Sequence, residues 1–286
     1  MSRRVLLAAT IALAVGAAIG GQAASNGLAE ANELLFRQLL EVHRLGDGQL
    51  AALRAIFARS GFIGQGNPAI SSHPVSEQRC RDELAKKQIS YADPTFERIC
   101  AAPYMAPLYD PAHQKPEDAP AYIDQFELPE IPCVYPVVWV KAHEAAEMCE
   151  AVGKRLCDAH EWEGACAGAL EAPDYRFDLA QGVSPNAAVE RMRHAHNRAD
   201  APTKSWSYGP AYRSGVCGTS SHKSPNCPGG GWGLCGSNTF PDGTFPTCRS
   251  PLGVYDLNGN AAEHMNLPLD PSRWRAAAAR ASATPR

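Results

Sequence analysis

Apolar residues at helical spacing dominate the chain between residues 26 and 60. They recur three or four residues apart on both sides of the "GDG" at 46–48: Leu35, Leu39 and Val42, then Leu50, Leu53 and Phe57. The pattern predicts a helical hairpin over residues 26–60. Such a stripe is more typical of a packing surface than of a partner-binding or membrane-apposed element, and we interpret His43 in the same way.

Residues 61–120 have no sustained hydrophobic period and hold Gly, Pro and Ser in clusters such as "GQGNPAISSHPVS". This texture predicts a loop or linker region with one short polar helix near Glu77–Gln88. Cys80 and Cys100 lie in this region, and we expect both to form disulfide bridges. Spacing alone does not identify their partners.

The texture changes at about Ala121. A short alternating stretch is followed by a β-rich run at residues 137–140 and then by a helix that places Ala146, Cys149 and Val152 on one face. Gly153 is a typical left-handed residue with which to end that helix.

A second helix is predicted to start immediately afterwards, because Asp158 and Glu161 have the spacing of a capping box. Trp162 and Cys166 then fall on the same side of it. We therefore expect two helices that meet at a corner, with Cys149 and Cys166 presented toward whatever packs there.

The final third is rich in Gly, Ser, Pro and Asn and predicts mostly irregular structure. Four cysteines lie between residues 217 and 248, and bridges among them would stabilise such a segment.

Composition narrows the class of protein. A length of 286 residues with 45% hydrophobic content allows one sizeable core, and a net charge of -3 gives no electrostatic case for nucleic acid. Ten cysteines without a CxxC pair favour an oxidising, extracytoplasmic compartment. Arg3 and Arg4 precede a long apolar run and small residues, which predicts an export signal over residues 1–25; an uncleaved membrane anchor is the alternative.

Two segments resemble the signatures of the formylglycine-generating enzyme (sulfatase-modifying factor) family: "PVVWVKAHEAAEMCEAVGKRLCDAHEWEGACAG" and "SPLGVYDLNGNAAEHMNL". The resemblance covers about residues 121–267. It implies an α+β, C-type-lectin-like domain with much irregular structure, preceded here by the helical hairpin. It also implies bound calcium and a secreted or periplasmic location.

The activity that the resemblance implies is oxidation of the cysteine in a sulfatase's Cys-x-Pro-x-Arg motif to formylglycine, with oxygen and a copper ion held by two cysteines. The partner would be a sulfatase or another protein substrate. The family's copper-binding pair follows the second signature, whereas residues 264–286 contain no cysteine. We therefore expect the copper site to be absent and assign no catalytic residue. A natural truncation and a shifted reading frame both remain open as the origin of a non-family tail at 268–286.

Other positions also depart from the family pattern. Cys149 and Cys166 correspond to family cysteines whose disulfide partners lie in that later segment, so we expect both to be unpaired or rewired. Trp139 stands where the family usually has Asn, and Ala262 and His264 replace an aromatic pair around the glutamate. These departures indicate a different subfamily.

The segment "YDLNGNAAEH" is a candidate calcium loop. Its possible ligands are the Asp256 and Glu263 carboxylates and the Gly259 and Ala261 carbonyl groups, which together form the hard-oxygen set that calcium prefers. An ordinary Asn-Gly turn is the alternative from spacing alone, and the resemblance to the family's calcium loop favours the metal. The ion would have a structural role.

The segment "RHAHNRAD" offers a weaker metal candidate. His194 and His196 would share one face if the segment were a strand, but no third ligand is evident nearby and histidines in a charged loop are common. The resemblance places Asn197 at a second calcium site.

Two functions remain after these observations. The first is an exported relative of the formylglycine-generating enzymes that has lost the activity. The second is a non-catalytic, lectin-like binding or structural module. No serine elbow, HExxH motif or dinucleotide loop supports a hydrolase or a nucleotide-binding enzyme.

Overall fold

The computed structural model describes residues 27–203, 205–219, 231–272 and 274. The expected export signal and most of the expected tail lie outside these residues. Within the described part, no helix is long and apolar enough to cross a bilayer.

The expected helical hairpin is present and belongs to the packed body. Its first helix is described over residues 27–43, and the second, α2, spans Asp47–Ser60 and ends at the left-handed Gly61. The Phe36 and Phe57 rings pack edge to face with centroids 5.0 Å apart. The apolar stripe is buried in a cluster that also contains Ile131 and Met148, which confirms the packing interpretation. His43 is likewise a packing residue, with its Nε2 2.8 Å from the Pro129 carbonyl.

Residues 61–120 contain more structure than the sequence predicts. The polar helix is confirmed as α3 (Glu77–Lys86). It is followed along the chain by four more elements: α4 (Pro94–Cys100), β1 (Met105–Leu108), η1 (Pro116–Asp118) and β2 (Ala121–Asp124). Strands β1 and β2 pair antiparallel, with Met105 opposite Asp124. The linker interpretation is wrong for this stretch, because strands of four residues are too short to show a period.

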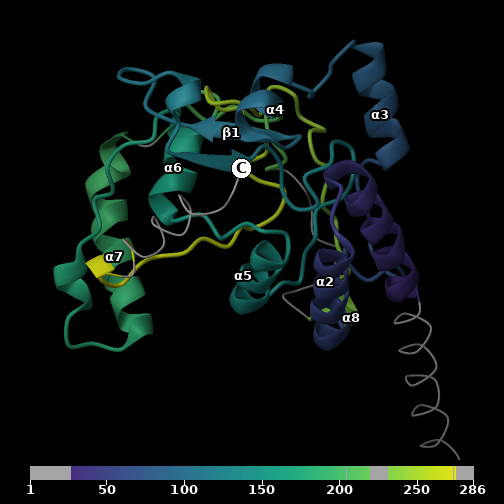
Figure 1. Cartoon of the computed structure of the whole chain (residues 1–286), viewed down its shortest axis with the longest axis horizontal. Helices are drawn as coiled ribbons and strands as arrows, with labels where there is room; N and C mark the ends of the chain where they lie inside the picture. Colours follow the sequence, from purple (N-terminus) through teal and green to yellow (C-terminus); the bar gives the residue numbers. More distant parts are fainter. Residues whose placement is uncertain (1–26, 204, 220–230, 273, 275–286) are drawn as a thin grey trace, which may run out of the picture.

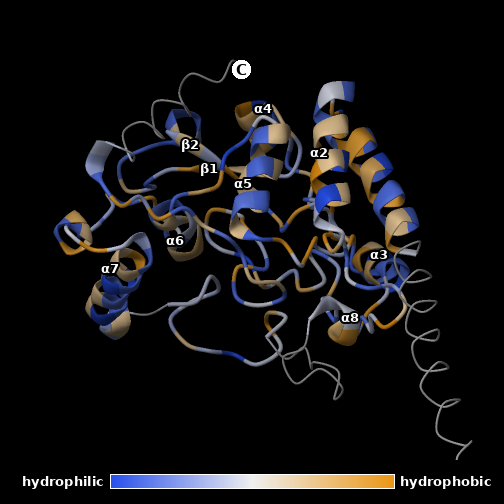
Figure 2. Cartoon of the chain, turned by 90° about the horizontal axis from the view of Figure 1, so that it is seen from below, coloured by the Kyte–Doolittle hydropathy of each residue, from blue (hydrophilic) through white to orange (hydrophobic). Residues whose placement is uncertain are grey.

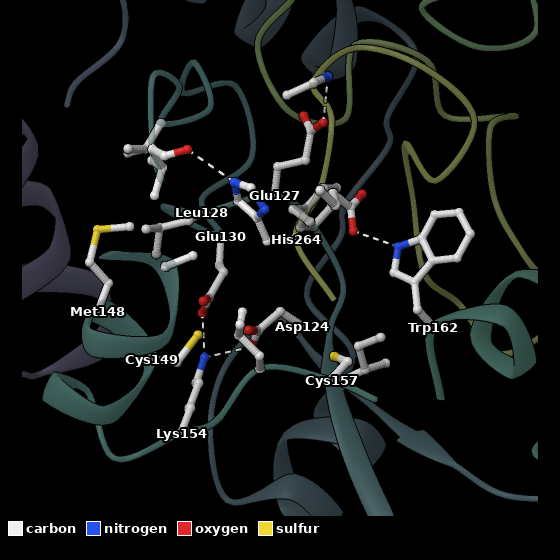
Figure 3. A pocket seen from close by; sticks show the side chains of 18 of the residues that line it. Asp124, Glu127, Leu128, Glu130, Met148, Cys149, Lys154, Cys157, Trp162 and His264 are labelled. Atoms are coloured by element: carbon white, nitrogen blue, oxygen red, sulfur yellow. Dashed lines mark hydrogen bonds and ion pairs between the residues drawn. The ribbon is translucent and has the colours of Figure 1, made fainter. Parts of the chain in front are cut away.

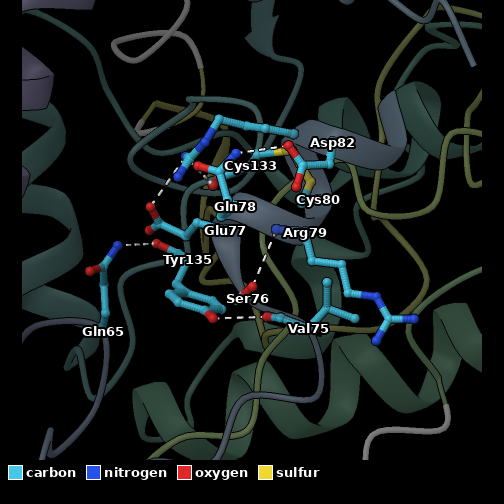
Figure 4. Close-up of polar contacts among 11 residues, drawn as sticks. Gln65, Val75, Ser76, Glu77, Gln78, Arg79, Cys80, Asp82, Cys133 and Tyr135 are labelled. Carbon is cyan, nitrogen blue, oxygen red and sulfur yellow. Dashed lines mark hydrogen bonds and ion pairs between the residues drawn. A yellow bond between two sulfur atoms is a disulfide. The ribbon is translucent and has the colours of Figure 1, made fainter. Parts of the chain in front are cut away.

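Helix α3 is attached to the body by a disulfide and by polar contacts (Figure 4). Cys80 is bonded to Cys133, 53 residues further along the chain. The Tyr135 hydroxyl donates to the Val75 carbonyl at 2.8 Å, and Gln65 donates to the Tyr135 carbonyl at 2.7 Å. Cys100, by contrast, is a buried free thiol, so the expected bridge at this residue is wrong.

The corner between α5 (Ala142–Ala151) and α6 (Ala159–Ala167) is confirmed. Gly153 follows α5 with a left-handed φ of 81°. The Asp158 amide donates to Glu161 Oε2 at 2.7 Å, which is one half of the predicted capping box. Arg155 also binds both Glu161 oxygens, at 2.7 and 2.5 Å, so the turn between the helices is fixed by one carboxylate.

The predicted strand at residues 137–140 is wrong. Only an isolated bridge forms, between Gly64 and Val138. Trp139 has a left-handed φ of 66°, which no strand residue adopts, and the preceding Pro136 cannot donate to a ladder.

The remaining chain is mostly irregular, as expected. Its regular elements are short except for α7: η2 (Phe177–Ala180), α7 (Pro185–Asp200), η3 (Ala201–Thr203) and α8 (Trp232–Cys235). A disulfide between Cys217 and Cys248 closes a loop within this region.

The two ends of the molecule are formed by α7 and by the hairpin, with β1, α5 and α6 between them (Figure 1). Both α2 and α7 carry hydrophilic and hydrophobic residues around their circumference (Figure 2). The described residues form two buried hydrophobic clusters. One lies beneath the hairpin and α5, and the other lies around the β1–β2 pair, α6 and residues 252–257. The architecture is α+β with a small two-stranded sheet.

Candidate functional site

A cavity of about 190 Å³ lies between the two hydrophobic clusters (Figure 3). One wall comes from the hairpin-side cluster through Val140 and Met148, and the other comes from Ile123, Val254 and Leu257 of the sheet-side cluster. The turn between α5 and α6 forms its floor, so the predicted helix corner is what shapes it.

Lys154, in that turn, is the central charge of the cavity. Its Nζ donates to Asp124 at 2.5 Å and to Glu130 at 2.6 Å, and Figure 3 shows it reaching both carboxylates. Burial alone would lower the pKa of Lys154, but the two carboxylates raise it above its ordinary value, so the amine stays charged. Burial and the neighbouring Asp124 raise the pKa of Glu130 to about 8, despite the opposing effect of Lys154. Two carboxylates thus share one ammonium group, and burial favours the neutral form of Glu130.

Two free thiols line the cavity. Burial raises the pKa of Cys149 to about 11, with Asp124 and Glu130 adding to the effect. Burial also raises the pKa of Cys157, together with Glu161 and Asp124. Both thiols therefore stay protonated at neutral pH and are weak nucleophiles.

The described thiols do not fit a two-cysteine copper site. Copper(I) favours paired soft thiolates, but the Cys149 and Cys157 side chains lie on either side of Asp124 (Figure 3). Cys166 packs in the sheet-side cluster, where burial raises its pKa to about 11 against a hydrogen bond with Asn258. Cys100 is buried at the end of α4. Cys149 and Cys166 are both unpaired, as expected from the departures in sequence.

The far end of the cavity is polar and is formed by Trp162, Glu263 and His264 (Figure 3). The Trp162 indole donates to Glu263 Oε2 at 2.5 Å. The Glu263 side chain is exposed at this end, and the surrounding chain and Asp124 raise the pKa of its carboxyl above the ordinary value. His264 Nε2 lies 3.0 Å from the Val140 carbonyl, which joins this end to the opposite wall.

The predicted calcium ligands belong to one loop, but Asp256 and Glu263 lie in different environments. Asp256 is buried and accepts a hydrogen bond from the Gly243 amide at 2.7 Å, whereas Glu263 belongs to the cavity. Gly259 occupies a φ of 140°, and the Ala261 amide donates to Glu127 Oε1 at 2.7 Å. The loop is therefore held by a residue outside it.

Sequence reasoning missed two buried carboxylates next to this loop. Glu127 binds the loop through Ala261 and through Asn260 Nδ2 at 2.6 Å. Asp242 is 0% exposed, and no N–H or hydroxyl group of the described residues donates to its carboxylate oxygens; its side-chain neighbour for a hydrogen bond is the Glu127 carboxyl group, which requires a shared proton. Burial, reinforced by the neighbouring carboxylates, raises the pKa of both well above the ordinary value. No motif could have shown this, since residues 127, 242 and 256 are far apart in sequence.

The Asp242 oxygens make the donor chemistry suitable for calcium. A buried carboxylate without a partner costs several kcal/mol unless it is protonated or neutralised by a cation. Calcium is bound by carboxylate and carbonyl oxygens, and both are present around Asp242 and the loop at 256–263.

The histidine pair lies on helix α7, so the strand-based geometry is wrong. His194 Nε2 lies 3.8 Å from Glu190 Oε1, while His196 faces three carboxylates. One of them, Asp200, lies on the same helix, and the other two, Glu163 and Asp174, come from earlier segments.

Taken together, these features define a disulfide-bonded α+β domain with a thiol-bearing cavity beside a loop held by buried carboxylates. The chain belongs to the sulfatase-modifying factor enzyme 1-like domain family, whose model matches residues 69–278. The match begins well before residue 121, so it includes α3, α4 and the strand pair. Comparison with curated proteins and with solved structures found no match.

Proposed function

We propose that this chain is an extracytoplasmic relative of the sulfatase-modifying factors that binds a segment of a protein partner in its cavity and does not itself oxidise cysteine. The observation that carries the proposal is the state of the cavity thiols. Cys149 and Cys157 are free, buried enough to stay protonated, and lie on either side of Asp124 (Figure 3). The family's oxidation needs a copper ion on two thiolates, which these residues do not supply.

The size and charge of the cavity favour one class of ligand. About 190 Å³ is less than the ~300 Å³ at which small-molecule sites begin, so the cavity suits a side chain of a bound segment. Its lining holds four carboxyl groups, Asp124, Glu127, Glu130 and Glu263, against the two cations Lys154 and Arg155. Burial shifts Glu127 and Glu130 toward their neutral form, and an arginine or lysine that enters would favour their ionised form, whereas an acidic side chain would not. A segment with an arginine or lysine is therefore favoured over an acidic one. The Cys-x-Pro-x-Arg motif of a sulfatase has this character.

Binding of peptides tests the proposal directly. We expect a Cys-x-Pro-x-Arg peptide to bind at least about tenfold more tightly than the same peptide with Glu in place of Arg, because a guanidinium can pair with the carboxyl groups of the cavity and a carboxylate cannot. Fluorescence anisotropy measures both affinities. Glu263→Gln should reduce the preference, whereas Glu150→Gln, on the exposed side of α5, should leave it unchanged. Equal affinities for the two peptides would contradict the charge argument.

A conversion assay tests the absence of oxidation. With copper, reductant and oxygen, mass spectrometry should show the peptide cysteine unmodified after incubation with the full chain. Conversion to formylglycine would instead establish the family's oxidase activity and overturn this part of the proposal.

We further propose that calcium stabilises the loop at residues 256–263. Asp256, Glu263 and the Gly259 and Ala261 carbonyls remain the proposed ligands, and the two buried carboxyl groups of Asp242 and Glu127, which lie next to each other, are the observation that supports a cation in this region. The ion would join the loop to the segment around Asp242 and take no part in chemistry. A C-type-lectin-like topology is part of the same proposal, and an experimental structure would test it.

A further inference from the structure

Four side chains from three segments converge at the end of the molecule formed by α7. His196 and Asp200 lie one turn apart on α7, Asp174 comes from the loop before η2, and Glu163 comes from α6. His196 Nδ1 lies 2.9 Å from Asp174 Oδ2 and 3.0 Å from Asp200 Oδ2, while its Nε2 lies 3.0 Å from Glu163 Oε1. This cluster is separate from the cavity, whose lining contains none of the four residues.

The arrangement around the imidazole is that of a metal ligand with a supporting carboxylate. In protein metal sites, the histidine that binds the ion usually donates its other ring N–H to a carboxylate, which fixes the tautomer. Nδ1 of His196 is hydrogen-bonded with Asp174 Oδ2 at 2.9 Å, and Glu163 Oε1 lies 3.0 Å from Nε2. In the tautomer with its hydrogen on Nε2, facing Glu163, the Nδ1 lone pair would face the oxygens of Asp174 and Asp200, which are acceptors as well.

A metal cation would satisfy Nδ1 of His196 and the oxygens of Asp174 and Asp200, which are all acceptors in this tautomer. One imidazole hydrogen cannot serve Asp174 and Asp200 equally, and even a protonated His196 leaves three carboxylates opposed by one positive charge. Within the described chain, no Lys or Arg forms an ion pair with Glu163, Asp174 or Asp200.

The distances suit a shared ion. Ligand atoms at right angles around a transition metal with bonds of about 2.1 Å lie about 3.0 Å apart. The ligand atoms of Asp174, His196 and Asp200 all lie within 4.8 Å of one another, and no other group of three or more such residues in the described chain meets that limit. An imidazole ligand favours a transition metal over calcium.

The supporting elements place these ligands without help from an ion. Buried Ala188 and Met192 orient α7, so that His196, one turn beyond Met192, is only 29% exposed. The loop that carries Asp174 is fixed by Tyr175, whose hydroxyl lies 2.9 Å from Nδ1 of His160 on α6. Glu163, three residues after His160 on α6, is held by the same helix.

From this geometry we infer that His196, Asp174 and Asp200 form a binding site for a divalent transition-metal ion such as Zn²⁺ or Mn²⁺, with Glu163 orienting the imidazole. The site joins α6, α7 and the intervening loop. Its carboxylates are about half exposed, at 53% for both Asp174 and Asp200, so water can complete the coordination shell. The inference does not depend on the peptide-binding proposal.

Equilibrium dialysis of the full chain against Zn²⁺, in a buffer that contains calcium, tests the site. We expect one more equivalent of bound zinc in the parent and in His194→Ala than in His196→Ala. His194→Ala is the matched control because this residue lies on the same helix but away from the cluster. Zinc bound by free thiols would appear equally in all three proteins. Glu163→Gln should weaken binding about 10- to 100-fold, as expected for loss of a supporting carboxylate.

Asp200→Asn keeps the test decisive if His196→Ala does not fold, because Asp200 is exposed and its amide replacement has the same shape. The visible spectrum of bound Co²⁺ should change in Asp200→Asn and remain unaltered in His194→Ala. The inference would be overturned if His196→Ala and Asp200→Asn both bound zinc like the parent and left the cobalt spectrum unchanged. A parent protein that binds no more zinc than His196→Ala would also overturn it.

Discussion

Single buried carboxylates determine the chemistry around the loop at 256–263. Asp242 is fully buried beside the Glu127 carboxyl group, and it lies next in sequence to Gly243, which donates to Asp256. Asp256 and Asn260 both adopt left-handed conformations, at φ values of 56° and 67°. Strain of this kind persists only where the surroundings stabilise it, and a bound cation would provide that stabilisation.

Calcium is therefore expected to raise the melting temperature of the parent protein. Replacing the charge at Asp242 with Asp242→Asn should remove most of that rise, because the cation loses a buried carboxylate. Asp178→Asn is the control, since Asp178 is exposed and paired only with Arg176. Scanning calorimetry with and without calcium measures the effect. An identical rise in the parent and Asp242→Asn would exclude Asp242 from the site.

The same carboxylates predict an unusual pH dependence. Burial raises the pKa of Asp256 to about 7 in the folded chain, against an ordinary value of 3.8. The folded state therefore binds the proton more tightly than the unfolded state, and the resulting stability is lost as pH rises through 7. Without calcium, the free energy of unfolding should increase by a few kcal/mol from pH 7 to pH 5, because one extra bound proton adds about 1.4 kcal/mol for each pH unit.

Urea titrations in a chelator check this dependence. Addition of calcium should oppose it, because protons and calcium compete for the same carboxylates. Stability that falls steadily from pH 7 to pH 5 in the chelator would show that these groups are already ionised in the folded chain.

At the residue scale, the sequence predicts contacts between neighbouring residues but not contacts between residues that are far apart in the chain. The Asp158 and Glu161 pair was predictable because a capping box has a fixed spacing. Asp242 and Glu127 were not, because burial brings them beside a loop that neither belongs to. His196 was noticed, but its partner Asp200 becomes visible only once the segment is known to be helical.

At the scale of elements, long amphipathic segments were predictable and short strands were not. The hairpin and α5 follow from apolar spacing, since their stripes are buried in one cluster. Strands β1 and β2 have four residues each, and Pro107 interrupts the pattern in the first. The predicted strand at residues 137–140 failed because Trp139 is left-handed, which its β-favouring neighbours do not reveal.

The α5–α6 turn is the element on which the cavity depends. Glu161 binds Arg155 twice and caps the Asp158 amide, so Glu161→Ala removes a cap and leaves a half-buried guanidinium without its carboxylate. We expect a loss of about 2–4 kcal/mol in the free energy of unfolding, together with weaker peptide binding.

Urea denaturation measures the loss, and Glu190→Ala on the exposed face of α7 is the control, with an expected change below about 0.5 kcal/mol. A Glu161→Ala protein as stable as the control would show that the turn does not rely on this carboxylate.

At the scale of the whole molecule, the fold is held together by two clusters and by disulfides that join distant segments. The Cys80–Cys133 and Cys217–Cys248 bridges are typical of an oxidising, extracytoplasmic compartment. The cavity lies between the two clusters, which is a common place for binding sites. Its apolar walls and carboxyl groups are the features on which the proposed binding of a basic protein segment rests.

The most direct test of this account is to locate the bound peptide. A Cys-x-Pro-x-Arg peptide that carries a photoreactive benzophenone can be cross-linked to the full chain and mapped by mass spectrometry. The account predicts cross-links at cavity residues such as Val140, Met148 and His264, lost on competition with unlabelled peptide. Cross-links confined to another surface, such as the exposed apolar side chains of Phe62 and Leu234, would contradict it.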